Sequence, residues 1–208
     1  MYRRKLFLII IILGIFAGFI FIFQFYKIFF LNNTKFKNDY SYVFIDRDDT
    51  IDSLNNQLLP LLKSIKGFNI AAKKKGYTYN IKPGKYKIDK GIGNNKIINI
   101  LRTKRLTVKV TFNNQERLKD LAGRVSSQIE ADSLELLNSF ENISFLEEFG
   151  FTEENAMSMY FPNTYEVYWD ISPDDFRKKM QNYYKSFWNK KRLNLAKLIK
   201  LDPKEVYI

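Results

Sequence analysis

An unbroken apolar run near the N-terminus dominates the hydrophobic pattern of the chain. Residues 6–23 contain no charged or strongly polar side chain, and Gln24, Phe25 and Tyr26 extend the run to Lys27. A helix rises about 1.5 Å per residue, so these roughly 18 to 21 residues span about 27–32 Å, close to the thickness of a bilayer's hydrocarbon core. The pattern therefore predicts one transmembrane helix, with an anchor domain over residues 1–31.

Charge lies unevenly around this run. Arg3, Arg4 and Lys5 precede it, and such a cluster keeps the adjoining end of a helix in the cytoplasm. The run is longer than that of a cleaved signal peptide, and no small-x-small cleavage site follows it. We therefore expect a single-pass anchor in the cytoplasmic membrane, with the N-terminus in the cytoplasm and the rest of the chain outside it.

Strand and helix patterns alternate after the anchor. Residues 32–41 are polar and are predicted to be a short tether, and residues 42–105 are predicted to form a small two-layer α+β unit. The expected elements are a strand at 42–45, a helix capped by Asp49 or Thr50, a second helix ending near Gly76, a strand at 85–88 and a helix capped by Asn94 or Asn95. Pro60 is expected to break the first helix or to start the second.

Residues 106–208 read as a second α+β domain. The alternation at 106–112 predicts a strand with one buried face, and Asn113 or Asn114 is the expected cap of the helix that follows. The apolar stripe of that helix is predicted to consist of Leu118, Leu121, Ala122, Val125 and Ile129. Two further helix starts are predicted at Asp132 and Ser172.

The helix after Ser172 carries aromatic residues at helical spacing. Such a stripe is more often part of the core than a platform for a ligand. Its members are Phe176, Met180, Tyr183, Tyr184, Phe187 and Trp188.

Composition limits the chemistry that this fold can perform. The chain has no Cys and no His, which excludes disulfides, thiolate catalysis, Cys-ligated zinc and every Ser-His or Cys-His nucleophile pair. Acid–base chemistry would therefore fall to Asp, Glu, Lys or Tyr. We expect no cofactor and no metal ion.

The chain is basic, with a net charge of +12. Four basic residues lie in or beside the apolar run (Arg3, Arg4, Lys5 and Lys27), which leaves 30 basic against 22 acidic residues elsewhere. A surplus of this kind suits a lipid surface, an acidic polymer or nucleic acid, but it is also the ordinary means of keeping a protein soluble.

Several motifs occur in an order that resembles a known family. Residues 159–166 read Met-Tyr-Phe-Pro-Asn-Thr-Tyr-Glu, similar to the FPDTYE signature of the endolytic murein transglycosylases, the YceG-like or MltG family. Four other segments are similar to that family's GxY turn, its VTFxE strand, its FW…R…A helix and its LTPEEV helix start: 82–86, 106–112, 187–196 and 202–206.

This resemblance implies a membrane-anchored enzyme that cleaves nascent peptidoglycan strands, leaves 1,6-anhydro-MurNAc ends and so terminates strand elongation. It implies a LysM-like subdomain at 42–105, the N-terminal part of the catalytic domain at 106–208, and a location in the bacterial inner membrane, facing the periplasm or cell wall. The implied partners are peptidoglycan glycan strands, the membrane and the cell-wall synthesis machinery, with no role for nucleic acid.

The resemblance also implies where the catalytic groups lie. The family's catalytic Glu belongs to the helix that Asp202 opens, just after Ile208, so residues 1–208 alone look cut off inside an element and are expected to be inactive. Glu166 is expected to be a supporting or surface residue. The substrate cleft is expected to include Tyr160, Phe161, Asn163, Thr164, Tyr165 and Glu166, with Pro162 fixing the turn and Asn163 in place of the family's usual Asp.

Two other functions fit the same sequence. A non-catalytic, membrane-anchored module could bind peptidoglycan and couple to other proteins, and the residues that follow Ile208 would separate it from the enzyme. A membrane-tethered nucleic-acid binder would account for the basic surplus, but the outward orientation would keep it from DNA, and no basic helix stands out.

Overall fold

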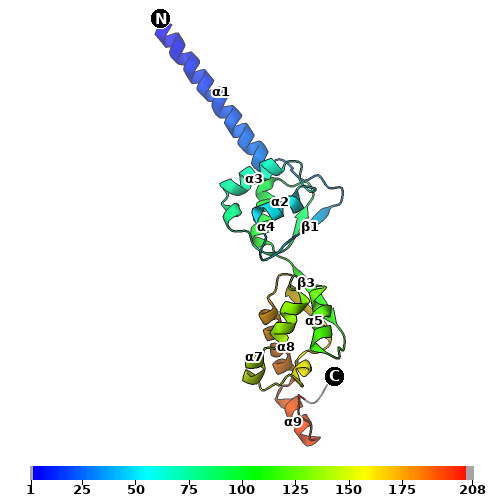
Figure 1. The fold of residues 1–208 in the computed structure, drawn as a ribbon. Coiled ribbons are helices and arrows are strands. Elements are labelled where there is room, and N and C mark those ends of the chain that lie inside the picture. The colour runs from blue at the N-terminus through cyan, green and yellow to red at the C-terminus, as the bar shows by residue number, and fades with distance from the viewer. Residues whose placement is uncertain (1, 205–208) are drawn as a thin grey trace. The chain divides into compact units, whose positions relative to one another are not determined.

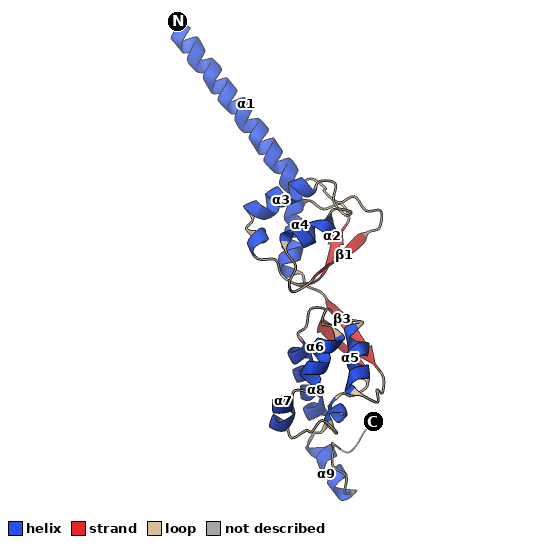
Figure 2. Ribbon diagram, viewed as in Figure 1, coloured by secondary structure: helices blue, strands red, loops and turns tan. Residues whose placement is uncertain are grey.

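The computed structural model describes residues 2–204, including every side chain except those of residues 3–6. The chain divides into two compact units, Met1–Arg105 and Leu106–Ile208, and each has its own hydrophobic core (Figure 1). Each unit combines helices with one two-stranded antiparallel sheet (Figure 2). The predicted α+β class is therefore confirmed.

The long N-terminal helix, α1, runs from Tyr2 to Phe30. Its residues Phe7–Phe30 are long and apolar enough to cross a membrane, as judged by length and composition. The helix continues past Lys27, where the apolar run was predicted to end, and Phe29 is buried in the core of the first unit. The last turn of α1 therefore belongs to the first unit.

The first unit packs its helices on one face of its sheet. Strand β1 pairs with β2 so that Tyr40 lies opposite Asp89 and Ile45 lies opposite Gly84. The buried side chains of the two strands are Val43, Ile45, Tyr86 and Ile88. After α1, the elements are β1 (Tyr40–Ile45), α2 (Ile51–Leu58), α3 (Ile65–Lys74), a 3-10 turn (Tyr77–Tyr79), β2 (Gly84–Asp89) and α4 (Asn94–Thr103).

Local capping explains most of these helix boundaries. Thr50 caps α2 as predicted, and its hydroxyl accepts a hydrogen bond from the amide of Ser53. Pro60 lies in the turn that separates α2 from α3, so it ends the first helix and does not start the second. The predicted cap of α4 was wrong: the N-cap is Gly93, and Asn94 is the first helical residue.

The segment predicted as a tether is partly built into the fold. Asn33 and Thr34 are only 6% and 3% exposed, and the amide of Lys35 donates to the carbonyl of Leu61. The Asn33 side chain accepts from the Ser64 amide at 2.8 Å and donates to Asn94 Oδ1 at 2.7 Å. Buried polar groups require such partners, and the sequence pattern alone could not show that these asparagines have them.

The second unit also packs helices against a sheet, with β3 (Thr107–Phe112) and β4 (Asn163–Tyr168) paired so that Phe112 lies opposite Asn163. Its core contains the inward side chains of the sheet and of α8, including Val110, Tyr165, Phe176 and Met180. The helices are α5 (Leu118–Ser126), α6 (Ser133–Phe140), α7 (Ile143–Glu148), α8 (Pro173–Phe187) and α9 (Lys190–Leu198), with a 3-10 turn at Ala156–Met159.

The helix starts predicted at Asp132 and Ser172 are confirmed, and the start predicted at Asn113 or Asn114 is wrong. Asp132 caps α6 in a capping box with Glu135, and Ser172 caps α8 with Pro173 in its first turn. The prediction for α5 was wrong, because its N-cap is Arg117 and no side chain caps it. A loop separates Phe112 from Leu118, so α5 begins later than the helix signal suggested.

Candidate functional site

The motif at 159–166 passes from the 3-10 turn through a short loop into β4. Successive side chains of a strand point to opposite faces of its sheet. Tyr165 therefore points to the buried face of β4, whereas Thr164 and Glu166 point to the exposed face. For this reason the six residues predicted to form one cleft do not all meet.

Three of the six line one pocket, which we call the aromatic pocket. It has a volume of about 480 Å³, and its lining residues are Asn114, Phe161, Pro162, Asn163, Tyr165, Tyr183, Ser186 and Phe187. The ring of Phe161 lies 4.6 Å from that of Phe187, and the ring of Tyr165 lies 4.9 Å from that of Tyr183. Two aromatic pairs therefore form its walls.

Tyr165 holds the loop of this pocket in place. Its hydroxyl donates a hydrogen bond of 2.6 Å to the carbonyl of Phe161. Burial, with a further contribution from the neighbouring Tyr183, raises the pKa of Tyr165 to about 12. The phenol is therefore neutral near pH 7, and it can position the loop but cannot act as a base there.

Tyr160 packs in the core, and it also lines a small hollow together with Asn114, Phe161 and Pro162. It is 5% exposed, and its ring lies 4.7 Å from that of Phe140. Burial raises its pKa well above the usual value, although the positive charge of Arg177 partly opposes this effect. The cleft role predicted for Tyr160 therefore stays a prediction.

Thr164 and Glu166 lie on the other face of β4, away from the aromatic pocket. The Thr164 hydroxyl is 2.8 Å from that of Thr111 on β3. Glu166 accepts a hydrogen bond of 2.5 Å from the hydroxyl of Thr107. Both side chains are exposed, and their contacts hold the edge of the two-stranded sheet together.

The aromatic pocket adjoins a line of further hollows. A small one shares Asn114, Phe161 and Pro162 with it. That hollow shares Met157 and Ser158 with a polar pocket of about 560 Å³. The other lining residues of the polar pocket are Glu116, Thr152, Glu154, Asn155 and Lys204. Because these pockets share lining residues, they lie side by side, and we call the row of pockets the groove.

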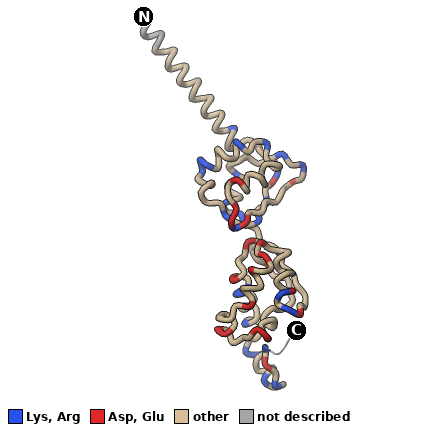
Figure 3. The backbone as a smooth tube through the Cα atoms, viewed as in Figure 1, with Lys and Arg blue, Asp and Glu red and all other residues tan. Residues whose placement is uncertain are grey.

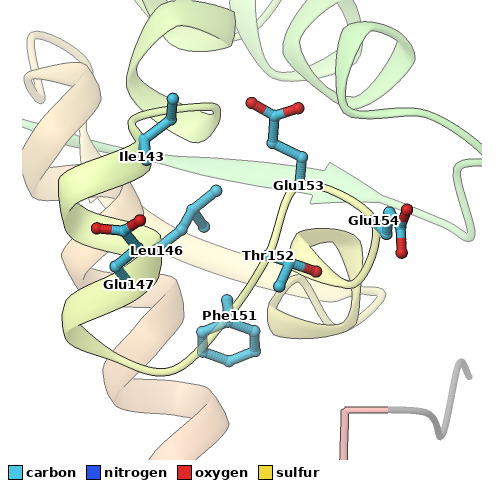
Figure 4. Close-up of a pocket in the computed structure, with 7 residues that line it drawn as sticks. All are labelled: Ile143, Leu146, Glu147, Phe151, Thr152, Glu153 and Glu154. Carbon is cyan, nitrogen blue, oxygen red and sulfur yellow. The ribbon is translucent and has the colours of Figure 1, made fainter.

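The groove ends at an acidic pocket of about 410 Å³ beside α7. Figure 4 shows Glu147 on that helix and Glu153 and Glu154 on the facing loop, with Phe151 below them. Among the residues that the structure describes, no three acidic side chains are grouped so as to hold a metal ion. The acidic pocket shares Thr152 and Glu154 with the polar pocket.

The segment predicted to open a helix at Asp202 lies beside this groove, because Lys204 lines the polar pocket. Asp202 Oδ1 accepts a hydrogen bond of 2.9 Å from the amide of Lys204, the bond expected of a helix cap. Lys204 donates to the carbonyl of Gly150 and lies over the ring of Phe151. The rest of that helix, and the Glu expected after Ile208, lie outside the described residues.

The chemistry of the aromatic pocket is that of a binding surface. The pocket's aromatic rings, its two amides and its three hydroxyls suit a sugar ring and its hydroxyl groups. None of the pocket's described lining residues is a carboxylate, lysine or arginine, so among these residues the pocket offers no carboxyl group for bond cleavage.

Four residues outside the motif also line this pocket: Asn114, Tyr183, Ser186 and Phe187. The sequence pattern predicts Asn114 as a helix cap and Tyr183 and Phe187 as core residues, and it carries no signal for Ser186. One signal could have identified the two aromatics: Tyr183 and Phe187 are four residues apart and lie at the edge of the stripe, beside Tyr184 and Trp188.

Comparison with known proteins gives a family match. The model of the YceG-like family matches residues 43–208. The crystal structure of a yceG-like protein from Listeria monocytogenes is similar over 79% of this chain, with 16% sequence identity and a TM-score of 0.43. The chain spans 60% of the length of that protein. No protein of curated function matches.

Proposed function

Because the chain belongs to the YceG-like family, we propose that it is part of a membrane-anchored lytic transglycosylase acting on peptidoglycan. The enzyme would cut nascent glycan strands within the strand, leave 1,6-anhydro-MurNAc ends and so end strand elongation. The observation that carries the proposal is the aromatic pocket, because the family's signature supplies Phe161, Asn163 and Tyr165 to its wall.

The proposed chemistry needs one carboxyl group. The acid gives its proton to the glycosidic oxygen as the C1–O bond breaks, and the sugar's own 6-hydroxyl attacks C1. The resulting carboxylate then takes the proton of that hydroxyl, so no water is consumed. This scheme is compatible with a chain that has no His and no Cys.

In this proposal the acid is a Glu on the helix that Asp202 opens. Lys204, two residues after Asp202, contacts Gly150 and Phe151 and lines the polar pocket. The groove links this place to the aromatic pocket through the shared residues Met157, Ser158 and Phe161. A strand bound along the groove would place one sugar on the aromatic wall and a neighbouring bond near the acid.

The proposal also requires that α1 spans the cytoplasmic membrane, with both units outside the cytoplasm. The chain has no Cys, so a single introduced cysteine is a unique probe of sidedness. Ser127 is exposed in the second unit, and Ser127→Cys should react in intact cells with a thiol reagent that cannot cross the membrane. If the introduced cysteine were labelled only after lysis, the second unit would lie in the cytoplasm, away from peptidoglycan. That result would contradict the proposal.

The enzymatic test uses the full-length protein in vesicles, incubated with uncrosslinked glycan strands. Mass spectrometry should detect 1,6-anhydro ends. Phe161→Ala should lower kcat/KM about tenfold, which corresponds to roughly 1.4 kcal/mol of lost contact with the sugar. The matched control is Tyr168→Ala, which removes an exposed ring from the other face of the same strand and should leave kcat/KM unchanged.

The absence of an acid from the aromatic pocket's described lining favours one second candidate, a peptidoglycan-binding module. The same assay separates the two functions. Strands that bind in a manner dependent on Phe161 but acquire no anhydro ends would favour the module over the enzyme.

A further inference from the structure

A second pocket lies where α1 enters the first unit, and we call it the juxtamembrane pocket. Its volume is about 290 Å³. Gln24, Lys27 and Ile28 on α1 form one side, and Lys63, Ser64 and Gly67 at the start of α3 form the other. The pocket therefore lies between the membrane-helix candidate and the body of the unit.

The walls of this pocket are held in place by buried asparagines. Asn94 donates a hydrogen bond of 2.7 Å to the carbonyl of Ile28, which ties α4 to the last turns of α1. Asn33 bonds to Asn94 and to both the amide and the carbonyl of Ser64. These two side chains are 3% and 6% exposed, so the hydrogen bonds are shielded from water. The pocket is preformed and does not depend on a flexible linker.

The pocket would lie at the level of the lipid headgroups. Phe29 is 7% exposed and packs in the core of the unit, whereas Phe30 is 51% exposed, so α1 contacts the unit on one side of its last turn. Residues 7–26, which precede this turn, make about 30 Å of helix, which matches the hydrocarbon core of a bilayer. Lys27 follows directly and falls where the hydrocarbon ends.

The charge around the pocket is positive. Lys27 and Lys63 are the charged residues among its described lining, and no carboxylate lines it. Lys63 makes one long contact of 3.4 Å to the carbonyl of Asn32, which leaves most of its donor capacity free. The Ser64 hydroxyl accepts from the Gly67 amide and keeps its own proton to donate.

The charge of the whole unit agrees with this local pattern. Residues 1–105 contain 20 basic and 6 acidic side chains, whereas residues 106–208 contain 14 and 16. The entire basic surplus of the chain therefore belongs to the unit that carries α1. Figure 3 shows more basic than acidic positions in that unit, including basic positions at the base of α1.

We infer that the juxtamembrane pocket binds the phosphate of an anionic phospholipid headgroup, with Lys27 and Lys63 as its cationic contacts and Ser64 as a hydroxyl donor. Such a contact fixes the height and rotation of the first unit at the membrane surface. The inference rests on the membrane anchoring in the proposed function, and it is independent of any catalytic step.

Native mass spectrometry of the full chain, extracted from vesicles of mixed phosphatidylglycerol and phosphatidylcholine, tests this site. The wild-type chain should retain phosphatidylglycerol in preference to phosphatidylcholine. Lys27→Gln and Lys63→Gln should each lower that retention about fivefold, the effect expected of one cation near an anionic lipid. The matched control is Lys73→Gln with Lys74→Gln, two exposed residues at the far end of α3, about 15 Å from the pocket.

Three outcomes would overturn the site. These are an equal loss of lipid in the Lys73 and Lys74 control, no preference for phosphatidylglycerol in the wild type, and displacement of the lipid by millimolar inorganic phosphate, which would make a free phosphate the ligand. A wild-type chain that does not co-sediment with vesicles would instead overturn the anchoring itself, so the two failures are distinguishable.

Discussion

At the scale of single residues, Gly93 shows how closely α1 approaches the first unit. A Cβ at this position would lie 2.6 Å from the carbonyl oxygen of Phe30 and 2.8 Å from that of Leu31. Both neighbours are backbone atoms, so Gly93→Ala must displace the last turn of α1. We expect it to lower the free energy of unfolding of the first unit by about 2 kcal/mol or more, measured by thermal unfolding in detergent micelles.

Gly123 provides the control for this substitution. It lies within α5, and nothing lies within 4 Å of the Cβ that alanine would add. Gly123→Ala should therefore stabilise the second unit by about 0.5–1 kcal/mol, because alanine restricts the unfolded chain and favours the helix. If Gly93→Ala did not lower the free energy of unfolding, the close approach of Gly93 to the end of α1 would be contradicted.

The raised pKa of Tyr165 should make the unfolding free energy of the second unit depend on pH. Burial raises its pKa in the folded state to about 12, from about 10 in the unfolded chain. The unfolded state therefore loses its proton first as the pH rises, so the contribution of Tyr165 is complete below pH 10 and declines between about pH 10 and 12. Urea midpoints between pH 8 and 11.5 should fall less steeply for Tyr165→Phe than for the wild type.

The comparison for this pH effect is Tyr168→Phe, which changes an exposed phenol on the other face of the same strand. It controls for the loss of one phenol hydroxyl from this strand. An identical slope for Tyr165→Phe and the wild type would show that the Tyr165 phenol is accessible to solvent.

The motif at 159–166 shows how far sequence reasoning reaches at this scale. The motif singled out residues that do line a pocket, Phe161, Asn163 and Tyr165. It could not separate them from Thr164 and Glu166, because that distinction requires knowing that residue 163 begins a strand and which face of the strand is buried. Both facts depend on pairing with β3, which lies more than fifty residues earlier.

At the scale of elements, the helix caps of the second unit can be compared directly. Asp132 accepts hydrogen bonds from the amides of Leu134 and Glu135 at 2.7 and 2.8 Å. Asp132→Ala should cost about 1 kcal/mol of unfolding free energy, because two amides at the start of α6 lose their partner. Urea denaturation of the purified chain, followed by circular dichroism, would measure this loss.

Asn113→Ala is the control for Asp132→Ala. The sequence predicted Asn113 as a possible cap of α5, but the N-cap of that helix is Arg117. Asn113 is exposed, and its side chain accepts only from the nearby Gln115 side chain within the described contacts. Its replacement should change the unfolding free energy by no more than about 0.5 kcal/mol. A loss as large as that of Asp132→Ala would restore the predicted cap of α5.

Elements with local signals were predictable, and elements that depend on distant partners were not. Thr50, Asp132 and Ser172 satisfy amides within three residues, so the sequence contains the whole interaction. Asn33 reads as part of a polar tether, but its partners are Ser64 and Asn94, 31 and 61 residues away. No window of local pattern includes those contacts.

At the scale of the whole molecule, the main question is where the membrane span ends and the first unit begins. Apolar composition continues through Phe30, so length and composition alone place the end of the span there. Packing gives a different answer, because Phe29 is buried among residues of the first unit and stacks 4.3 Å from Phe25. The two views assign different environments to the same aromatic side chain.

Two lysine substitutions distinguish these views. Phe16 lies at the middle of residues 7–26, and Phe16→Lys should reduce membrane integration at a cost of about 2.5–3.5 kcal/mol, while leaving the first unit folded. Phe29→Lys should leave integration intact, because the change falls outside the hydrocarbon. It should lower the stability of the first unit by about 3 kcal/mol or more, because it buries an unpaired charge and removes a packed ring.

Carbonate extraction of membranes would measure integration, and thermal unfolding in micelles would measure the fold. Should Phe29→Lys release the chain from membranes while its first unit stays folded, residues 27–30 would lie in lipid. Lys27 and Lys63 would then be too deep to meet a headgroup phosphate. The environment of Phe29 thus decides whether the last turn of α1 lies in the bilayer or packs as part of the first unit.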